Sequence, residues 1–189
     1  MATLSQEHEE RAGEIARRLS AVLLANDLRA AVAESLTGGK IATQLAAAPD
    51  SGAWFAGGVV CYSAEVKRRV LGVPHGPVIS QQAVETMARS VGVLMAADLA
   101  VATSGAGGPT TQEGQEPGTT WLAVLFGDQV HSELHHVDGE PLEILARTEE
   151  RALEMLWEAA TRWGPDDERH HQRPSAGSTN ATDPTTAHA

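Results

Sequence analysis

The sequence of 189 residues contains one cysteine, few aromatic residues and no long apolar run. Because Cys61 is alone, an internal disulfide is excluded, and a reducing compartment is expected. No apolar stretch approaches the ~18 residues that a membrane helix requires. The first residues also lack the apolar segment of a secretory signal. We therefore expect a cytoplasmic protein, and the hydrophobic share of 42% suffices for one buried core.

Basic residues are also scarce, with 14 lysines and arginines against 25 acidic residues and a formal net charge of −11. Nucleic-acid-binding proteins carry a basic face or stripe, which this composition does not provide. We therefore expect neither a nucleic-acid nor a membrane partner. The histidines do not form a convincing metal-binding set, so we expect no metal and no cofactor. An anionic substrate would have to rely on a few local cations and backbone amides.

Strands and helices alternate along the chain, as judged from hydrophobic periodicity and from glycine, proline and capping residues. The predicted strands cover residues 28–34, 57–62 and 99–103, and the predicted helices cover 15–23, 40–48, 65–72, 84–94 and 142–160. Two further strands, 119–126 and 129–137, are joined by Gly127-Asp128 and predict an antiparallel hairpin.

This order predicts a three-layer α/β/α sandwich with a mixed, mostly parallel sheet and one C-terminal antiparallel hairpin. We assign residues 1–163 to a single domain. Residues 164–189 have almost no large apolar side chain and are interpreted as a disordered polar tail. The loop over 104–118 is too long for a simple connector, and such loops are usually functional or disordered.

Hydroxyl groups and glycines follow the first predicted strand. Ser35 and Thr37 precede Gly38 and Gly39 at the expected carboxyl edge of the sheet, where open α/β sheets bind ligands. The following helix offers N–H groups and a positive dipole end, which suit a phosphate or a developing oxyanion. A purely structural interpretation also stays open, in which Ser35 caps this helix and the glycines let it pack closely.

Two other strand ends carry chemically useful residues. Tyr62 follows the 57–62 run, and Lys67 lies on the helix that follows. Twelve of the 14 basic residues are arginine, whereas a desolvated lysine can act as a base and an arginine cannot. Thr103 and Ser104 end the third strand, before glycines that leave the backbone open to close approach. A phenol at a strand end and a solvated basic helix face are the structural alternatives.

Taken together, three runs resemble the C-terminal domain of the competence/damage-inducible protein CinA, the nicotinamide-nucleotide amidase family. They are AESLTGG (33–39), GGVVCYSAEVK (57–67), and TSGAGGP followed by GTT. The resemblance extends from about Glu14 to Trp163. It implies a homo-oligomer that hydrolyses nicotinamide mononucleotide, a pyridine nucleotide, to nicotinic acid mononucleotide and ammonia without a metal.

The resemblance also implies roles for residues. Ser35 would attack the carboxamide carbon, and its proton would pass to Lys67, directly or through Tyr62, as in Ser-Lys variants of the catalytic triad. Helix N-terminal amides near Thr37 would stabilise the oxyanion. The implied oxyanion and substrate-binding residues are Glu34, Thr37, Gly38, Gly39, Thr103, Ser104, Gly105, Gly107, Gly118 and Thr119.

The sequence departs from the family pattern at two late arginines, which align with Pro141 and Leu145. The family cysteine after the serine is Leu36, and a family asparagine is Ala64. Two alternatives to a nicotinamide-nucleotide amidase therefore remain. One is a non-catalytic nucleotide-binding or interaction domain on the same scaffold, and the other is an amidase for a carboxamide that carries no phosphate.

Overall fold

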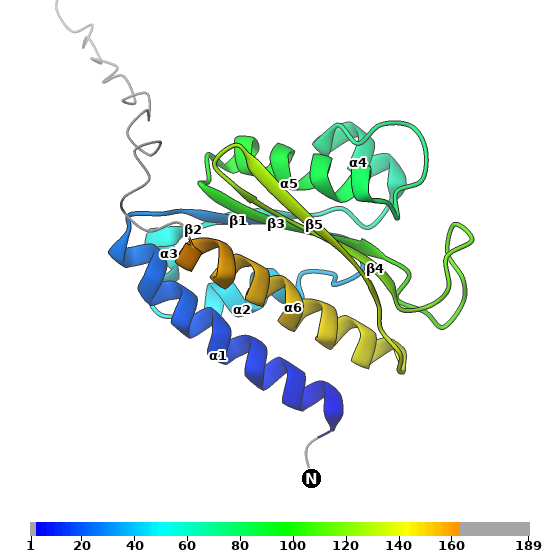
Figure 1. The fold of residues 1–189 in the computed structure, drawn as a ribbon, viewed down its shortest axis with the longest axis horizontal. Helices are drawn as coiled ribbons and strands as arrows, with labels where there is room; N and C mark the ends of the chain where they lie inside the picture. Colours follow the sequence, from blue (N-terminus) through cyan, green and yellow to red (C-terminus); the bar gives the residue numbers. More distant parts are fainter. Residues whose placement is uncertain (1–2, 163–189) are drawn as a thin grey trace, which may run out of the picture.

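A computed structural model describes residues 3–162, in which a five-stranded sheet is covered by helices on both faces (Figure 1). The strands are β1 (Ala30–Glu34), β2 (Phe55–Val60), β3 (Leu99–Gly105), β4 (Thr119–Phe126) and β5 (Gln129–His136). The helices are α1 (Leu4–Ala25), α2 (Lys40–Ala47), α3 (Ser51–Trp54), α4 (Ala64–Leu71), α5 (Gln81–Met95) and α6 (Pro141–Arg162). α4 and α5 cover one face, and α1, α2 and α6 cover the other.

The strand order is β2-β1-β3-β4-β5. β1 is parallel to both β2 and β3, whereas β4 runs antiparallel to β3 and pairs with β5 as a hairpin. The predicted α/β sandwich with its C-terminal hairpin is therefore confirmed. β1 lies between two parallel neighbours, so its carboxyl end is flanked by the ends of β2 and β3.

Side chains of β1 alternate between two apolar cores, because successive residues of a strand point to opposite faces. Ala30 and Val32 contribute to the core under α1, α2 and α6. Ala31 and Ala33 contribute to the core under α4 and α5. By the same alternation the Glu34 side chain lies on the face of the sheet that α2 covers, so its carboxylate can reach the N–H groups at the start of α2.

Three predicted helix ends are confirmed by capping contacts, namely both ends of α4 and the start of α5. Ser63 Oγ accepts the Val66 N–H at the start of α4, and Ser80 Oγ accepts the Ala83 N–H at the start of α5. Gly72 ends α4 with a φ of 65°, a left-handed conformation that glycine adopts without strain.

Four details differ from the sequence prediction. The helix predicted over 15–23 is longer, because α1 begins at Leu4 behind the capping residue Thr3. β2 begins and ends two residues earlier than expected, so Tyr62 lies beyond the strand. β3 continues to Gly105, because its pairing with β4 extends to Thr120. The short helix α3 occupies a segment that was expected to be a loop. The predicted tail, 164–189, lies outside the described residues, and within 3–162 no helix is long and apolar enough to cross a membrane.

Candidate functional site

The carboxyl ends of the three parallel strands form one small cavity. Ser35 follows β1, Tyr62 lies two residues beyond β2, and Gly105 ends β3. The cavity has a volume of about 180 Å³. It is lined by Ser35, Leu36, Tyr62, Gly105, Gly107, Gly108, Gln112, Pro141 and Leu145. The structure thus brings these three strand ends together at one cavity, as the strand order predicts.

Glu34, the last residue of β1, holds the helix that follows the serine. Its side chain is fully buried and accepts N–H groups from Gly39 (2.9 Å), Ile41 (3.2 Å) and Ala42 (2.8 Å). A carboxylate at a helix N-terminus is stabilised by these donors and by the helix dipole. The N-terminus of α2, where a ligand anion could bind, is therefore occupied by the carboxylate of Glu34.

This contact changes the expected roles of the glycines. The Gly39 N–H is used by Glu34, and the Gly38 N–H donates to the Ser35 carbonyl at 3.1 Å. Gly39, with a φ of 100°, is the residue that caps α2, so the interpretation of Ser35 as its cap is wrong. Gly38 and Gly39 thus shape the turn and do not offer free donors to a substrate.

Other backbone N–H groups remain open at the cavity. In the described part of the chain, the N–H groups of Leu36, Gly107 and Gly108 donate to no protein acceptor. All three residues line the cavity beside Ser35. N–H groups of this kind are the usual donors to the oxyanion formed when a serine attacks a carbonyl.

Thr37 and Thr103 stabilise the turn that carries Ser35 without lining the cavity. Both side chains are buried, and their hydroxyl oxygens lie 3.0 Å apart in a hydrogen bond. The Ser35 N–H also donates to the Thr103 carbonyl at 3.1 Å. The two threonines therefore fix the position of Ser35 from outside the cavity lining.

Lys67 is buried next to the cavity without lining it. Its side chain is only 1% exposed, and Nζ donates to the backbone carbonyl of Tyr62 at 3.3 Å. Burial lowers the pKa of Lys67, because an ammonium loses hydration there. Burial also raises the pKa of the neighbouring Cys61 thiol, which favours its neutral form. Lys67 is therefore in an environment that favours a neutral amine, the form that accepts a proton.

The remaining predicted residues support the long loop between β3 and β4. Ser104 Oγ donates to the Val78 carbonyl at 2.6 Å. The Gly118 N–H donates to Ala106 at 2.8 Å, and the Ala106 N–H donates to Thr119 at 2.9 Å. Ser104, Gly118 and Thr119 thus hold the loop and are not among the cavity-lining residues.

Gln112 lines the cavity and was not identified from the sequence. It precedes Glu113 and Gly114, which form a two-residue turn closed by Gln115. A Gln-Glu-Gly-Gln run resembles a tight hairpin turn with glycine at its second position, and this was the signal available in the sequence.

Pro141 and Leu145 also line the cavity. These are the two positions at which the resemblance described above implies arginines. The wall at the start of α6 is therefore apolar, and among the described residues the cavity lining contains no charged side chain.

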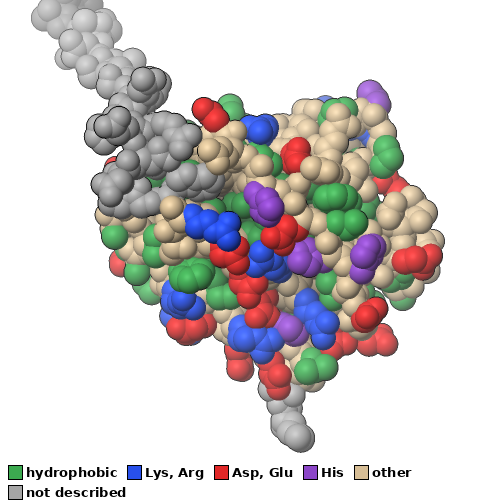
Figure 2. Space-filling view, in the orientation of Figure 1, with side chains coloured by type: hydrophobic (Ala, Val, Ile, Leu, Met, Phe, Trp, Pro, Cys, Tyr) green, Lys and Arg blue, Asp and Glu red, His purple; other side chains and the backbone are tan. Residues whose placement is uncertain are grey.

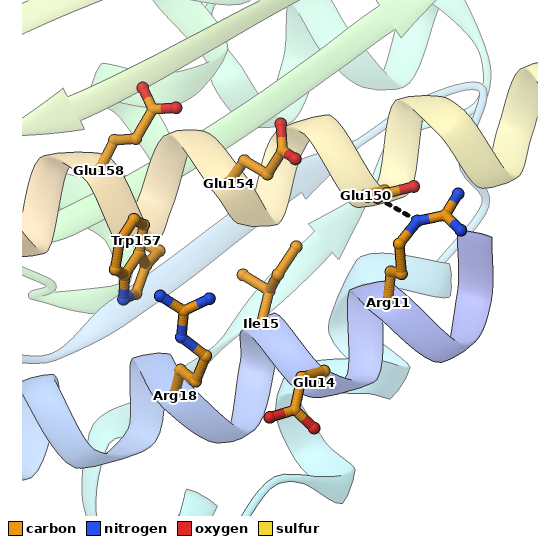
Figure 3. A pocket seen from close by; sticks show the side chains of 8 residues that line it. All are labelled: Arg11, Glu14, Ile15, Arg18, Glu150, Glu154, Trp157 and Glu158. Carbon is orange, nitrogen blue, oxygen red and sulfur yellow. Dashed lines mark hydrogen bonds and ion pairs between the residues drawn. The ribbon is translucent and has the colours of Figure 1, made fainter. Parts of the chain in front are cut away.

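A second and larger hollow of about 380 Å³ lies between α1 and α6 (Figure 3). The two arginines that line this hollow have partners within the protein. The Arg18 guanidinium lies 4.3 Å from the ring centre of Trp157, and Arg11 Nε donates a hydrogen bond to Glu150 at 2.7 Å. None of the residues predicted for the site lines it. We therefore assign the site to the smaller cavity.

Charged groups and histidines gather on the face formed by α1, α6 and β5 (Figure 2). Arg151 bridges Glu133, Glu154 and Glu158 there, and it lowers the pKa of the Glu133 carboxyl to about 2. Lys40, the other lysine of the chain, pairs with Glu9 at 2.5 Å and therefore ties α2 to α1. Of the two lysines, only Lys67 adjoins the cavity.

The fold and the site define an α/β protein with a buried serine at the carboxyl end of a central parallel strand. The CinA C-terminal domain family matches residues 12–160. The chain belongs to this family.

Three relatives illustrate the match. The nicotinamide-nucleotide amidohydrolase PncC of Pseudomonas putida is 40% identical over 153 residues, 78% of this chain and 96% of that protein. A CinA-like protein of Gemmatimonas aurantiaca is 36% identical over 75% of this chain, which spans 34% of that longer protein. The crystal structure of competence damage-inducible protein A from Klebsiella pneumoniae has a TM-score of 0.78 at 33% identity, over 81% of this chain and 99% of that one.

We predict that Glu34→Gln destabilises the protein by about 1–3 kcal/mol, since an amide replaces an ionised acceptor of three buried N–H groups. Urea unfolding of both proteins measures the difference. Glu65→Gln, in the exposed first turn of α4, makes the same charge change as a control. Equal and negligible losses in the two variants would contradict the role assigned to Glu34.

Proposed function

We propose that this protein is a nicotinamide-nucleotide amidohydrolase that uses Ser35 as its nucleophile. The observation that carries the proposal is the shared cavity of Ser35, Tyr62 and unpaired backbone N–H groups, with the buried Lys67 adjoining it. In the described part of the chain Ser35 Oγ has no hydrogen-bond partner, which leaves it free to face a substrate. The identity of 40% to a nicotinamide-nucleotide amidohydrolase supports the same reaction.

The reaction proceeds in two stages. Ser35 Oγ forms a bond to the carboxamide carbon and gives up its proton, which Lys67 receives. The proton returns to the amide nitrogen, the carbon–nitrogen bond breaks, and ammonia leaves an ester on Ser35. Water then hydrolyses this ester to the free acid and restores the serine. The metal-independent form of this sequence requires only the side chains named here.

Tyr62 lies between Lys67 and the cavity in the network of contacts. Lys67 Nζ is bonded to the backbone carbonyl of Tyr62, and the Tyr62 side chain lines the cavity that contains Ser35. In the proposed reaction the proton passes from Ser35 to Lys67, either directly or through the Tyr62 hydroxyl, which can both donate and accept a hydrogen bond. The N–H groups of Leu36, Gly107 and Gly108 stabilise the oxyanion, in place of the α2 glycines.

The size of the cavity limits what it encloses. Sites that enclose a whole drug-sized ligand have volumes of about 300–1,000 Å³, whereas this cavity has about 180 Å³. It therefore takes the ring and carboxamide, and leaves a ribose phosphate outside. Because Pro141 and Leu145 bring no charge to the wall, an amidase for a carboxamide without a phosphate is the second candidate function.

We predict that the purified chain releases ammonia from nicotinamide mononucleotide and that Ser35→Ala lowers kcat by at least about a thousandfold, since the nucleophile is removed. Coupled detection of ammonia measures the rates. Ser51→Ala, a serine in the short helix α3, is the matched control. Binding of the nucleotide without turnover in the unsubstituted protein would instead support the non-catalytic nucleotide-binding domain.

We predict that kcat falls as the pH decreases through the lowered pKa of Lys67, because only the neutral amine accepts the serine proton. Lys67→Met should abolish turnover and raise the free energy of unfolding at neutral pH. The sign follows from burial: the unfolded chain holds the Lys67 proton more tightly, so the folded wild type becomes more stable as the pH rises toward the ordinary lysine value. A pH–rate profile and urea unfolding test both statements. Retained turnover in Lys67→Met would contradict its role as the base.

We predict that Leu145→Arg raises kcat/KM for nicotinamide mononucleotide relative to nicotinamide riboside by about tenfold, since the new guanidinium attracts the phosphate. Parallel assays of both substrates give the ratio. Leu142→Arg adds the same charge on an exposed position of α6, outside the cavity lining. A ratio that rises equally in both variants would show a general charge effect and not a local one.

A further inference from the structure

We propose that Gln112 is a substrate-binding residue that recognises a neutral group able both to donate and to accept hydrogen bonds. This inference rests on the proposed function, because it assigns a role within the same cavity. Gln112 lines the cavity with Ser35 and Tyr62. Its side-chain amide makes no hydrogen bond to any described residue, so both of its polar atoms are available.

The backbone of Gln112 is fixed by a tight turn. The N–H of Gln112 donates to the Gln115 carbonyl at 3.1 Å, and the N–H of Gln115 donates back at 2.9 Å. Glu113 and Gly114 between them have φ values of 52° and 75°. Two positive φ values in a two-residue connection are typical of a type I′ hairpin turn. The exposed loop is therefore ordered at the residue that faces the cavity.

The same turn is anchored to a second segment of the chain. Glu113 Oε2 accepts the N–H groups of Val78 (2.8 Å) and Ile79 (3.1 Å). The Val78 carbonyl in turn accepts the buried Ser104 hydroxyl from the end of β3. A chain of hydrogen bonds thus runs from β3 through Val78 to Glu113, the neighbour of Gln112. Such anchoring lowers the entropy that a binding side chain loses when its ligand arrives.

The rest of the lining indicates which kind of ligand group Gln112 binds. The polar side chains of the lining are Ser35, Tyr62 and Gln112, and its large apolar side chains are Leu36, Pro141 and Leu145. Ser35 is committed to the reacting carbon. Gln112 therefore presents a neutral donor and acceptor pair, which matches a carboxamide or a hydroxyl group and not a phosphate.

The test measures binding in the full chain carrying Ser35→Ala, so that no ligand is consumed. Isothermal titration with nicotinamide, nicotinamide riboside and nicotinamide mononucleotide is carried out with and without Gln112→Ala. Gln115→Ala removes an identical side chain from the other end of the turn and is the matched control. We expect Gln112→Ala to weaken binding about fivefold or more, and Gln115→Ala to leave it unchanged.

The three ligands separate the possible outcomes. A loss that is already present with nicotinamide assigns the carboxamide to Gln112, whereas a loss that begins with the riboside assigns a sugar hydroxyl. Equal affinities with and without Gln112→Ala would overturn this inference and leave the proposed function intact. If none of the ligands binds even when Gln112 is present, both the inference and the proposed function are overturned.

Discussion

Glu34 ends β1 and places a fully buried carboxylate against three backbone N–H groups at the start of α2. A buried ionised group is tolerated only when donors replace its lost water, and the helix N-terminus provides them. The contact fixes α2 relative to β1, and the turn that carries Ser35 spans the gap between them. The geometry of the site, including which N–H groups remain free, therefore depends on this carboxylate.

The distribution of charge separates structural from functional surfaces. The formal charge of −11 is accompanied by ion pairs on the face of α1, α6 and β5, where Arg11 and Arg151 neutralise neighbouring carboxylates. The cavity at the strand ends has a neutral lining instead. The proposed reaction at a neutral carboxamide suits this lining, because charge would develop only during the reaction, next to backbone N–H groups. An isolated basic group, Lys67, is kept buried beside it.

Much of the architecture could be predicted from the sequence. Alternating apolar runs gave the strands, and capping residues such as Ser63 and Ser80 gave helix starts, because these signals are local. The convergence of Ser35, Tyr62 and Gly105 was also predictable, since parallel strands end at one edge. The hydrogen-bond partners of the Gly38 and Gly39 N–H groups could not be predicted. The Gly39 N–H donates to the Glu34 carboxylate, whose orientation depends on the face of the sheet on which the side chain lies. Gln112 was missed because its loop is positioned by Val78 and Ile79, far away in sequence.

The sequence by itself determined the α/β class, the order of strands and helices, the family resemblance and the candidate nucleophile. These follow from periodicity, turn chemistry and short residue patterns, which are properties of neighbouring residues. Only the tertiary structure decided that Lys67 is buried beside the cavity, that Pro141 and Leu145 form its wall, and that Thr37 and Thr103 stay behind it. Which side chains are buried and which line the cavity depends on packing between segments that are distant in sequence. Their hydrogen-bond partners, and the exclusion of water around them, are fixed only when the helices pack on the sheet.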